Sequence, residues 1–329
     1  MATLGTSAFT LSDWAKRLDP KGKIAETVNL LSQDNEMLDD MLWREGNLPT
    51  GERVTIQTGL PSVYWGLIGQ GTPESKSTTA QVDEQCGILS GRSKVDVRLA
   101  RLNSNVSELR LSEGKTFLEA MNQEMQQTMI YGAASSPEEF VGLANRYSSL
   151  SANNGQNIVS AGGSGSDNSS IYLVGWGEKS VYGIFPKGTK AGVMHEDLGV
   201  QDAFDSNSYR FRAYMDYWEW SAGLVVKDWR YCVRIANIDI SALIADGAGS
   251  SVKLIEYMLK ALHRLPTMAG IKPVFYANRT VKEMLDIQSM NKANVYLNTT
   301  EAEGRLKTTF RGVPIRTVDA LTEAEAAVT

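Results

Sequence analysis

Hydrophobic positions near the N-terminus recur with helical spacing. A short amphipathic stretch carries Trp14 and Leu18 and ends at Pro20, because the residue before a proline avoids the α region. A second helical pattern runs to Leu42 and has an aliphatic stripe on one face: Ile24, Val28 and Leu31. Both predicted helices need a surface that covers their apolar faces, either on their own domain or on a neighbouring subunit.

After the break at residues 46–51 the pattern changes from helical to extended. Residues 53–58 predict a strand, and residues 93–102 alternate apolar and charged positions, which predicts a matching strand with one solvated face. The segment between them is rich in glycine and small residues and offers little material for a core. Together these features predict a long two-stranded excursion, which needs a partner surface because an isolated hairpin is only marginally stable.

The strongest helical pattern covers residues 112–131. Ser112 suits the N-cap, Gly132 suits the C-terminal cap, and one face repeats every four residues: Phe117, Met121, Met125 and Met129. We interpret this methionine stripe as ordinary core packing rather than as a binding face.

The remaining chain mixes strands and helices. Residues 151–170 are small and polar and predict a surface loop, Gly223 is expected to mark a bend between two strands, and the tail after Leu321 is expected to form a short helix or a frayed end. Further elements are predicted as strands at 171–174, 181–185, 209–238, 273–277 and 312–316 and as helices at 250–263 and from 280 onward. This order predicts an α+β fold rather than regular strand–helix alternation.

Composition narrows the functional classes. The 329 residues are 42% hydrophobic and 22% charged, which is typical of a globular protein, and the net charge of -5 lacks the basic excess expected of a dedicated nucleic-acid binder. Cys86 and Cys232 lie far apart without a CxxC partner, so we expect two thiols. With no secretory signal and no apolar run long enough to span a bilayer, the chain is expected to stay in the cytoplasm or in an assembly made there.

Candidate chemistry is sparse, and we predict no catalytic, cofactor-binding or metal-binding residues. His195 and His263 lack the spacing of a zinc motif, and the neighbourhood of His195 is interpreted as a surface loop. Residues 183–190 resemble a phosphate-binding loop, but Thr189 precedes Lys190, which reverses the order that the motif requires. A run of basic residues reads as an interface or solvated face first and as a nucleic-acid patch second: Arg92, Lys94, Arg98 and Arg101.

Short strings across nearly the whole chain carry a family resemblance. They are GKIA at 22–25, EGNLPTG at 45–51, TGLPSVYW at 58–65, KSTT at 76–79, RLSE at 110–113, AMNQ at 120–123, YG at 131–132, FVGLANRY at 140–147, VGWG at 174–177, FPKG at 185–188 and DWRY at 228–231. In their number and order the strings resemble the major capsid proteins of short-tailed, podovirus-type bacteriophages.

The resemblance implies the HK97-like capsid fold. Its parts would be an N-terminal arm at 1–48, an extended loop (E-loop) at 49–106, a spine helix and the start of the peripheral domain at 107–150, and mixed axial and peripheral segments at 151–329. The implied function is structural: self-assembly into the hexamers and pentamers of an icosahedral head that encloses double-stranded DNA. The residues chosen as candidate intersubunit contacts are Trp14, Ile24, Val28, Leu31, Trp65, Arg92, Lys94 and Arg98.

The implied partners are copies of the chain itself, scaffold, portal and cementing or decoration proteins, and packaged DNA held by weak non-specific contacts, with no membrane. The implied location is the virion capsid, assembled in the host cytoplasm. Some relatives of this fold cross-link an extended-loop lysine to an asparagine of a neighbour, and we expect no such triad here. Two alternatives stay open: an α+β nucleotide- or substrate-binding enzyme, and another phage structural protein such as a decoration or tail protein.

Overall fold

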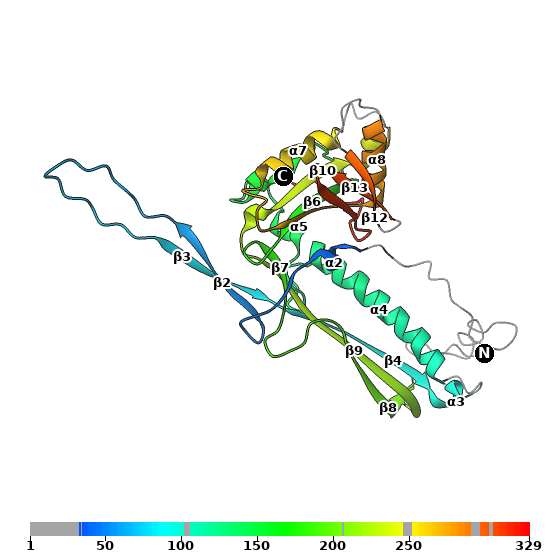
Figure 1. Cartoon of the computed structure of the whole chain (residues 1–329). Helices are drawn as coiled ribbons and strands as arrows, with labels where there is room; N and C mark the ends of the chain where they lie inside the picture. Colours follow the sequence, from blue (N-terminus) through cyan, green and yellow to red (C-terminus); the bar gives the residue numbers. More distant parts are fainter. Residues whose placement is uncertain are drawn as a thin grey trace. The chain divides into compact units, whose positions relative to one another are not determined.

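A computed structural model describes residues 33, 35–101, 106–205, 207–245, 252–290, 297–302 and 305–329 (Figure 1). The described chain forms two compact units. The first, here called the helix unit, contains Gln33, residues 88–126 and residues 192–221; the second, the sheet unit, contains the described residues of 35–87, 127–191 and 222–329. The helices predicted before Gln33 lie outside the described residues, but the second helical pattern, predicted to run to Leu42, is wrong in its described part, where only Met37–Asp40 is helical.

The helix unit combines a long helix with a small antiparallel sheet. Its helices are α3 (Val97–Ala100) and the part of α4 (Val106–Tyr131) up to Gln126, and its strands are β4 (Gly87–Asp96), β8 (Met194–Phe204) and β9 (Arg210–Val226) up to Ser221. β8 pairs with β9 in an antiparallel hairpin, and β9 lies next to β4. Apolar side chains of helix and sheet form a small core: Val95, Val106, Leu109, Ala100 and Tyr214.

The long predicted helix is confirmed, although it begins at least six residues earlier than Ser112. Its first turns are helical because Leu109 is buried in the helix-unit core, a tertiary contact that the local sequence does not reveal. The methionine stripe is buried as expected at Met121, Met125 and Met129.

The strand predicted at 93–102 is only partly correct. β4 ends at Asp96, whose side chain accepts a hydrogen bond from the Arg98 N–H at 2.7 Å and so caps α3. Val97 and Leu99 are buried, as a strand face would be, but they lie on a short helix. Alternating apolar residues over so short a stretch are compatible with either a strand or a short helix, and here the cap at Asp96 favours the helix.

The sheet unit holds one large mixed sheet. Its strands are β1 (Trp43–Glu45), β5 (Ile158–Ser160), β6 (Asn168–Trp176), β7 (Val181–Phe185), the end of β9, β10 (Cys232–Asp239), β11 (Lys272–Ala277), β12 (Leu297–Ala302), β13 (Arg305–Phe310) and β14 (Val313–Thr317). The strand order is β12-β13-β14-β11-β6-β7-β9; β10 pairs with β5 and β6, and β1 pairs with β7.

Helices cover this sheet and close its main core. α7 (Leu254–Arg264) and α8 (Arg279–Met290) match the two helices predicted there, and α7 buries Leu254, Met258 and Leu262. These side chains pack with sheet residues such as Leu173 and Phe275, so the amphipathic face of α7 becomes part of one hydrophobic cluster. Short helices complete the unit: α2 (Met37–Asp40), α5 (Leu143–Arg146) and α6 (Ile240–Ala245). None of the described helices is long and apolar enough to cross a bilayer.

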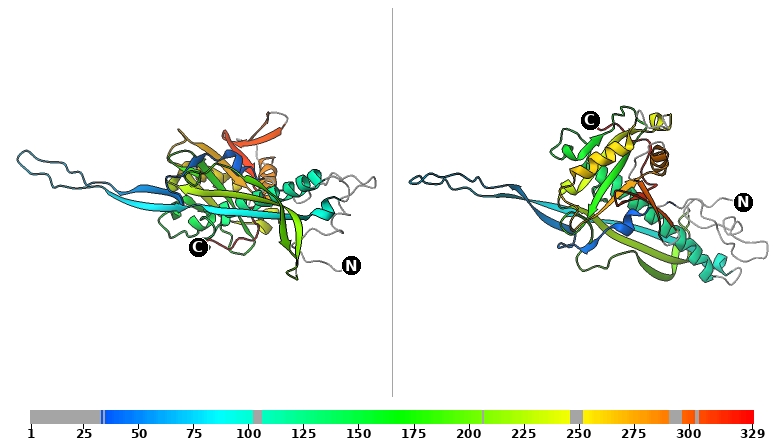
Figure 2. Two further views of the ribbon diagram at one scale, coloured as in Figure 1. Left: turned by 90° about the horizontal axis from the view of Figure 1, so that it is seen from below. Right: turned by 45° about the horizontal axis from the view of Figure 1, so that its top comes forward.

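A long hairpin projects from the sheet unit (Figures 1 and 2). It is built from β2 (Gly51–Gly59) and β3 (Thr78–Gln85), paired antiparallel from Gly51↔Gln85 to Gly59↔Thr78 with an irregularity after Gln57. The two-stranded excursion is therefore confirmed, but β3, not the strand near 93–96, is the partner of β2.

Three local predictions in the sheet unit are wrong. Residues 151–170 are not a free loop, because Ile158–Ser160 form β5 against β10. β9 runs unbroken through Gly223, where an added Cβ would lie 2.8 Å from the Gln85 carbonyl oxygen, so the glycine serves close approach instead of a bend. The tail is neither helical nor frayed, since Leu321 and Val328 are buried.

Candidate intersubunit surfaces

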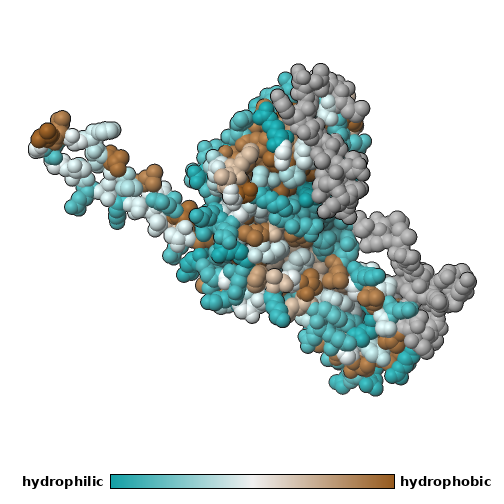
Figure 3. Space-filling view, in the orientation of Figure 1, coloured by the Kyte–Doolittle hydropathy of each residue, from teal (hydrophilic) through white to brown (hydrophobic). Residues whose placement is uncertain are grey.

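The far end of the β2–β3 hairpin carries an uncovered apolar cluster, here called the tip. Relative exposure reaches 90% for Val63, 104% for Trp65 and 107% for Ile68, and Leu60 and Leu67 are also exposed. The brown patch at the far end of the projecting hairpin in Figure 3 belongs to this cluster. Such a cluster is costly in water, because each large apolar side chain gains roughly 1.5–3 kcal/mol when it is buried.

The tip lacks a strand ladder of its own. The described polar contacts between its two sides are few: the Ser75 hydroxyl donates to the Ser62 carbonyl at 2.6 Å, and the Gln70 N–H donates to the Leu67 carbonyl at 3.1 Å. Residues 60–77 therefore form a long irregular loop beyond the paired strands. Its apolar residues have no second layer within the sheet unit to pack against.

The root of the hairpin, in contrast, is firmly attached to the sheet. Val54 packs with Tyr182, Ile184 and Val225 in a small core. The Tyr182 hydroxyl donates to Glu52 at 2.7 Å, and burial together with this carboxylate raises the pKa of the tyrosine. A hairpin that is anchored at its root and exposes apolar side chains at its tip is suited to contact another molecule.

The predicted contact residues fall into three groups. Trp14, Ile24, Val28 and Leu31 lie outside the described residues, and Trp65 lies at the tip. Arg92, Lys94 and Arg98 lie together in the helix unit, on β4 and α3.

The basic residues of β4 contact aromatic rings of their own unit. The Arg92 guanidinium lies 5.2 Å from the centre of the Tyr217 ring. Lys94 Nζ lies 5.9 Å from the centre of the Phe211 ring and donates to the Phe204 carbonyl at 3.2 Å. Arg98 pairs with Asp96 at 3.2 Å, yet 85% of its side chain is exposed. Arg92 and Arg98 are exposed and so are open to a neighbour, whereas Lys94 is half-buried.

His195 was expected on a surface loop, but it is the second residue of β8 and belongs to a polar cluster. Its Nε2 lies 3.0 Å from Asp216 Oδ1, and its ring stacks on Trp218 with centroids 5.2 Å apart. Arg110 of α4 reaches both Asp216 and Asp197 at 2.6 Å. The guanidinium lowers the pKa of Asp197, and the two carboxylates raise the pKa of Arg110. The cluster ties α4 to the β8–β9 hairpin.

No group of three or more potential metal ligands occurs among the described residues. Arg110, Asp197 and Asp216 all take part in salt bridges, so the geometry of the Arg110 cluster suits structural cross-bracing within the helix unit.

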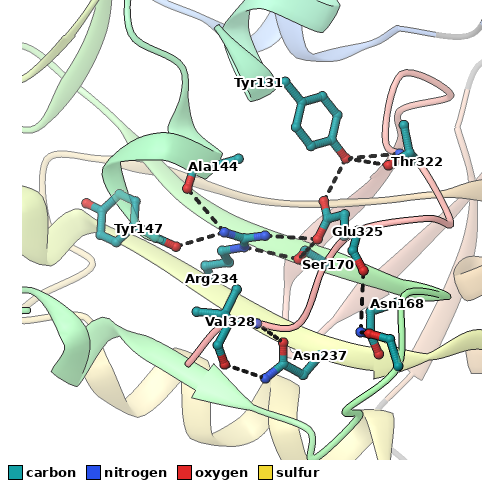
Figure 4. Close-up of polar contacts among 11 residues, drawn as sticks. Tyr131, Ala144, Tyr147, Asn168, Ser170, Arg234, Asn237, Thr322, Glu325 and Val328 are labelled. Carbon is teal, nitrogen blue, oxygen red and sulfur yellow. Dashed lines mark hydrogen bonds and ion pairs between the residues drawn. The ribbon is translucent and has the colours of Figure 1, made fainter. Parts of the chain in front are cut away.

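A second polar network lies buried in the sheet unit and fixes the tail (Figure 4). Arg234 pairs with Glu325 at 2.9 Å, and each side chain is only 5% exposed. The Ser170 hydroxyl donates to the same carboxylate, and the Tyr131 hydroxyl donates to its other oxygen at 2.6 Å. Burial, followed by the Glu325 charge, raises the pKa of Tyr131. Farther along, Asn237 holds Val328 by two hydrogen bonds of 2.7 and 2.9 Å.

A third cluster centres on Asp40 at the end of α2. Lys272 Nζ lies 2.6 Å from its Oδ1, Arg316 Nε lies 3.2 Å from its Oδ2, and the Tyr276 hydroxyl also donates to it at 3.2 Å. The Asp40 side chain is almost fully buried. This cluster fastens the chain that enters the sheet unit to β11 and β14, and buried charges of this kind are stable only when they are paired.

The loop at 183–190 is folded as a turn. The Gly188 N–H donates to Glu45 at 2.8 Å, and the Lys187 N–H donates to the Leu48 carbonyl at 3.3 Å. The Thr189 hydroxyl donates to the Pro186 carbonyl at 2.7 Å. Donors that would face a bound phosphate are therefore used within the chain, and a carboxylate occupies the position where an anion would lie.

Both cysteines are free thiols, as predicted. Burial raises the pKa of Cys86 to about 11 and that of Cys232 to about 12. Such thiols are poor nucleophiles at neutral pH, since the thiolate is the reactive form.

Sequence reasoning selected Trp65 but missed its neighbours in the tip. A signal was present: residues 60–68 hold six apolar side chains without the alternation that a half-buried strand would show. The Arg234–Glu325 pair had no local signal, because 91 residues separate its members.

Comparison with known proteins gives a clear family match. A sequence-family model described as "Major capsid protein GP7" matches residues 19–329. A comparison with curated proteins gives no match.

Among solved structures, the chain is similar to the bacteriophage Epsilon15 structure determined by electron cryomicroscopy. The two share 32% sequence identity, the match covers 100% of both chains, and the TM-score is 0.78. Lower similarity extends to the capsid of a native GTA particle, with 10% identity, 68% of this chain, 96% of that chain and a TM-score of 0.47. The capsid of Myoviridae phage XM1 gives 10% identity, 65% and 95% coverage and a TM-score of 0.45.

Proposed function

The chain belongs to the major capsid protein GP7 family, and from this premise we propose that the tip of the β2–β3 hairpin joins neighbouring copies into an icosahedral phage head. The chain has the α+β, HK97-like fold of a phage capsid protein, and its role is structural. The repeating units of the head are hexamers and pentamers of this chain, and the shell encloses double-stranded DNA.

The observation that carries the proposal is the contrast between the root and the tip of the hairpin. The root is fixed by Val54 and by the Glu84–Arg146 pair, whereas Val63, Trp65 and Ile68 are almost fully exposed. A second copy supplies the missing apolar layer, because identical chains in a closed ring can each cover the next. Burying three such side chains contributes roughly 5–9 kcal/mol per contact before the costs of association are subtracted.

We assign the functional segments in the order expected from the sequence. Residues 1–48 act as the arm, 49–106 as the extended loop, 107–150 as the spine helix and first peripheral segment, and 151–329 as the mixed axial and peripheral segments. In this scheme α4 is the spine helix and the sheet unit contributes to both domains.

The predicted contacts take their place in the same scheme. Trp14, Ile24, Val28 and Leu31 belong to the arm, and Trp65 to the extended loop. Arg92, Lys94 and Arg98 serve a second contact region, in which 85% of the Arg98 side chain is exposed.

Other partners follow from the role of a phage shell. The proposed partners are a scaffold protein, a portal protein, and cementing or decoration proteins, with assembly in the host cytoplasm. The packaged DNA touches the inner face by weak contacts without sequence preference, which agrees with the net charge of -5.

The nucleotide-binding alternative has lost its best feature. Its candidate loop uses the N–H groups of Lys187 and Gly188 for contacts within the chain. The family match also argues against a decoration or tail protein, since it covers residues 19–329 and names a major capsid protein.

The experiment that tests the role of the tip compares assembly of the full chain with that of a Trp65→Ser, Ile68→Ser variant. Light scattering and negative-stain electron microscopy are read on both at equal concentration, with and without an added scaffold protein. We expect shells or capsomers from the parent chain and only small species from the variant, because the variant removes apolar area that a neighbour would cover.

A matched control changes two exposed polar residues of the same loop, Gln70→Ser and Thr72→Ser, and should assemble like the parent chain. Equal assembly of the parent and of the Trp65→Ser, Ile68→Ser variant would contradict the proposed role of the tip. Circular dichroism of the unassembled chains checks that both variants fold, which we expect because all the changed residues are exposed.

A further inference from the structure

An apolar groove lies within the helix unit, between α4 and the β8–β9 hairpin. Its volume is about 520 Å³, and its walls include Leu111, Leu118, Val193 and Trp218. Leu111 is 63% exposed and Leu118 is 44% exposed, so both leave apolar surface of α4 uncovered beside the groove. Gly114 lies between them, and a Cβ there would come within 3.3 Å of the Trp218 ring.

Four polar side chains at the groove already contact one another. Arg110 is paired with Asp197 and Asp216, and His195 contacts Asp216. A ligand recognised mainly by charge would have to displace these pairs. The groove therefore suits an apolar occupant, for which Leu111, Gly114 and Leu118 offer a shallow row along one face of α4.

The chain itself leads to this row. The Gln33 N–H donates to Glu119 Oε1 at 3.1 Å, so Gln33 lies beside the α4 residue that follows Leu118. Leu31 precedes Gln33 by two residues, which limits its Cα to about 7 Å from the Cα of Gln33. Residues before Gln33 thus start at the groove, at a high effective concentration relative to any separate molecule.

The sequence of that segment matches the row in spacing. Ile24, Val28 and Leu31 form the aliphatic stripe of a predicted helix, and Ile24 and Leu31 are seven residues apart. Leu111 and Leu118 are also seven residues apart, so both pairs span about 10.5 Å along a helix axis. A helix that runs parallel to α4 would set Leu31 near Leu118, Val28 over Gly114 and Ile24 near Leu111.

We propose that residues 24–31 of the same chain dock as a helix in this groove and cover Leu111, Gly114 and Leu118. The docked segment completes the core of the helix unit from the N-terminal side. In this arrangement Ile24, Val28 and Leu31 contact their own chain, and of the four arm residues predicted as intersubunit contacts only Trp14 keeps that role. The inference concerns the single chain and does not depend on shell assembly.

Cysteine cross-linking of the full, unassembled chain tests the docking. The variant pairs are Leu31→Cys with Leu118→Cys and Ile24→Cys with Leu111→Cys, each combined with Cys86→Ala so that the buried Cys232 is the only other thiol. A disulfide requires Cα atoms within about 7 Å, so both pairs should oxidise within one chain, seen as a faster monomer band on a non-reducing gel.

The control pair is Leu31→Cys with Thr116→Cys, because Thr116 is exposed and points about 200° away from Leu118 around the helix axis. It should oxidise at least tenfold more slowly. Equal rates for Leu118→Cys and Thr116→Cys would overturn the proposal. Bonds that form only between chains would also overturn it, since a second copy would then be the occupant.

Hydrogen exchange gives a second readout that needs no cysteine. In the full chain with Val28→Asp, amides of residues 107–118 should exchange about tenfold faster than in the parent, while amides of β2 and β3 should not change. Glu26→Gln is the matched control on the same predicted helix and should leave exchange unchanged. Unaltered exchange in the Val28→Asp chain would overturn the docking. Failure of shells to form leaves both readouts intact, so the two proposals fail independently.

Discussion

Arg146 of α5 forms a bidentate salt bridge with Glu84 of β3, in which the Nη1–Oε1 and Nη2–Oε2 distances are each 2.6 Å. The same side chain donates from Nε to the Val141 carbonyl and from Nη2 to the Leu224 carbonyl. One arginine thus joins the hairpin root to α5 and to the end of β9. Because the two donors belong to one planar guanidinium, the contact is directional as well as strong.

Glu84→Gln should loosen the hairpin root. Both side chains are mostly buried, so removing the negative charge leaves Arg146 without its counter-ion and lowers the free energy of unfolding by about 2–4 kcal/mol. Urea denaturation of the unassembled chain measures the loss. The neighbouring pair Arg53–Asp83 has the same type of double contact but lies in solvent. Asp83→Asn is therefore the control, with no measurable change expected; an equal loss in both variants would contradict the assignment to burial.

Glu325→Ala should destabilise the sheet unit more than any other change in the tail. It leaves the buried guanidinium of Arg234 unpaired and removes the acceptor of Ser170 and Tyr131, at a cost of about 3–5 kcal/mol. Thermal and urea unfolding provide the measurement. Glu323→Ala removes the same side chain from an exposed position two residues away and should change little. Similar stability of the two variants would show that the network is not required.

Gly132→Ala should be poorly tolerated although Gly132 does not have a left-handed backbone. An added Cβ would lie 2.2 Å from the Phe140 carbonyl oxygen and 2.5 Å from the Thr128 carbonyl oxygen. Both neighbours are backbone atoms, so the chain must shift, at a cost of about 1–3 kcal/mol. Gly71→Ala, with nothing within 4 Å of the new atom, is the matched control. Calorimetric melting should separate the two, and an unchanged melting temperature for Gly132→Ala would refute the packing argument.

Stability should fall at alkaline pH partly through the thiols. Burial raises the pKa of Cys86 from 9.0 to about 11 and that of Cys232 to about 12, so the unfolded chain releases these protons first as the pH rises. The contribution is complete below pH 9.0 and is lost between pH 9.0 and the raised values, at up to about 1.4 kcal/mol per pH unit for each thiol.

Urea unfolding between pH 8 and 11 measures that slope, and Cys86→Ala should make it shallower. Cys232 should react with an aromatic disulfide reagent only after the chain unfolds, because the native thiol is buried. An identical slope in parent and variant would contradict the role of Cys86.

Much of the fold could be predicted from the sequence where a pattern is long and local. The methionine repeat of α4 and the amphipathic face of α7 each extend over three or more turns, so the helices were identifiable from spacing alone. The errors fall where tertiary contacts decide. β3 has few apolar residues and pairs with β2 through backbone hydrogen bonds, which leave no trace in hydrophobic periodicity.

The candidate surface was predicted only in part, for the same reason. Trp65 was selected through a short string shared with a protein family, whereas Val63 and Ile68 needed the geometry of an unpaired loop. The role of Glu325 depends on Arg234 and Tyr131, which lie 91 and 194 residues away in the sequence. No local pattern records a partner at that distance.

The Arg234–Glu325 pair also sets an order of events during synthesis. The ribosome adds Arg234 to the chain well before Glu325, because the two lie 91 residues apart. At typical elongation rates the delay is roughly 5–20 s. Until then the side chain of Arg234 on β10 lacks its counter-ion. Asn168 of β6 and Asn237 of β10 also lack their hydrogen-bond partners in the tail, Glu325 and Val328. The C-terminal tail is therefore the last part of the sheet unit to pack. A nascent chain that stalls before residue 325 cannot form these contacts.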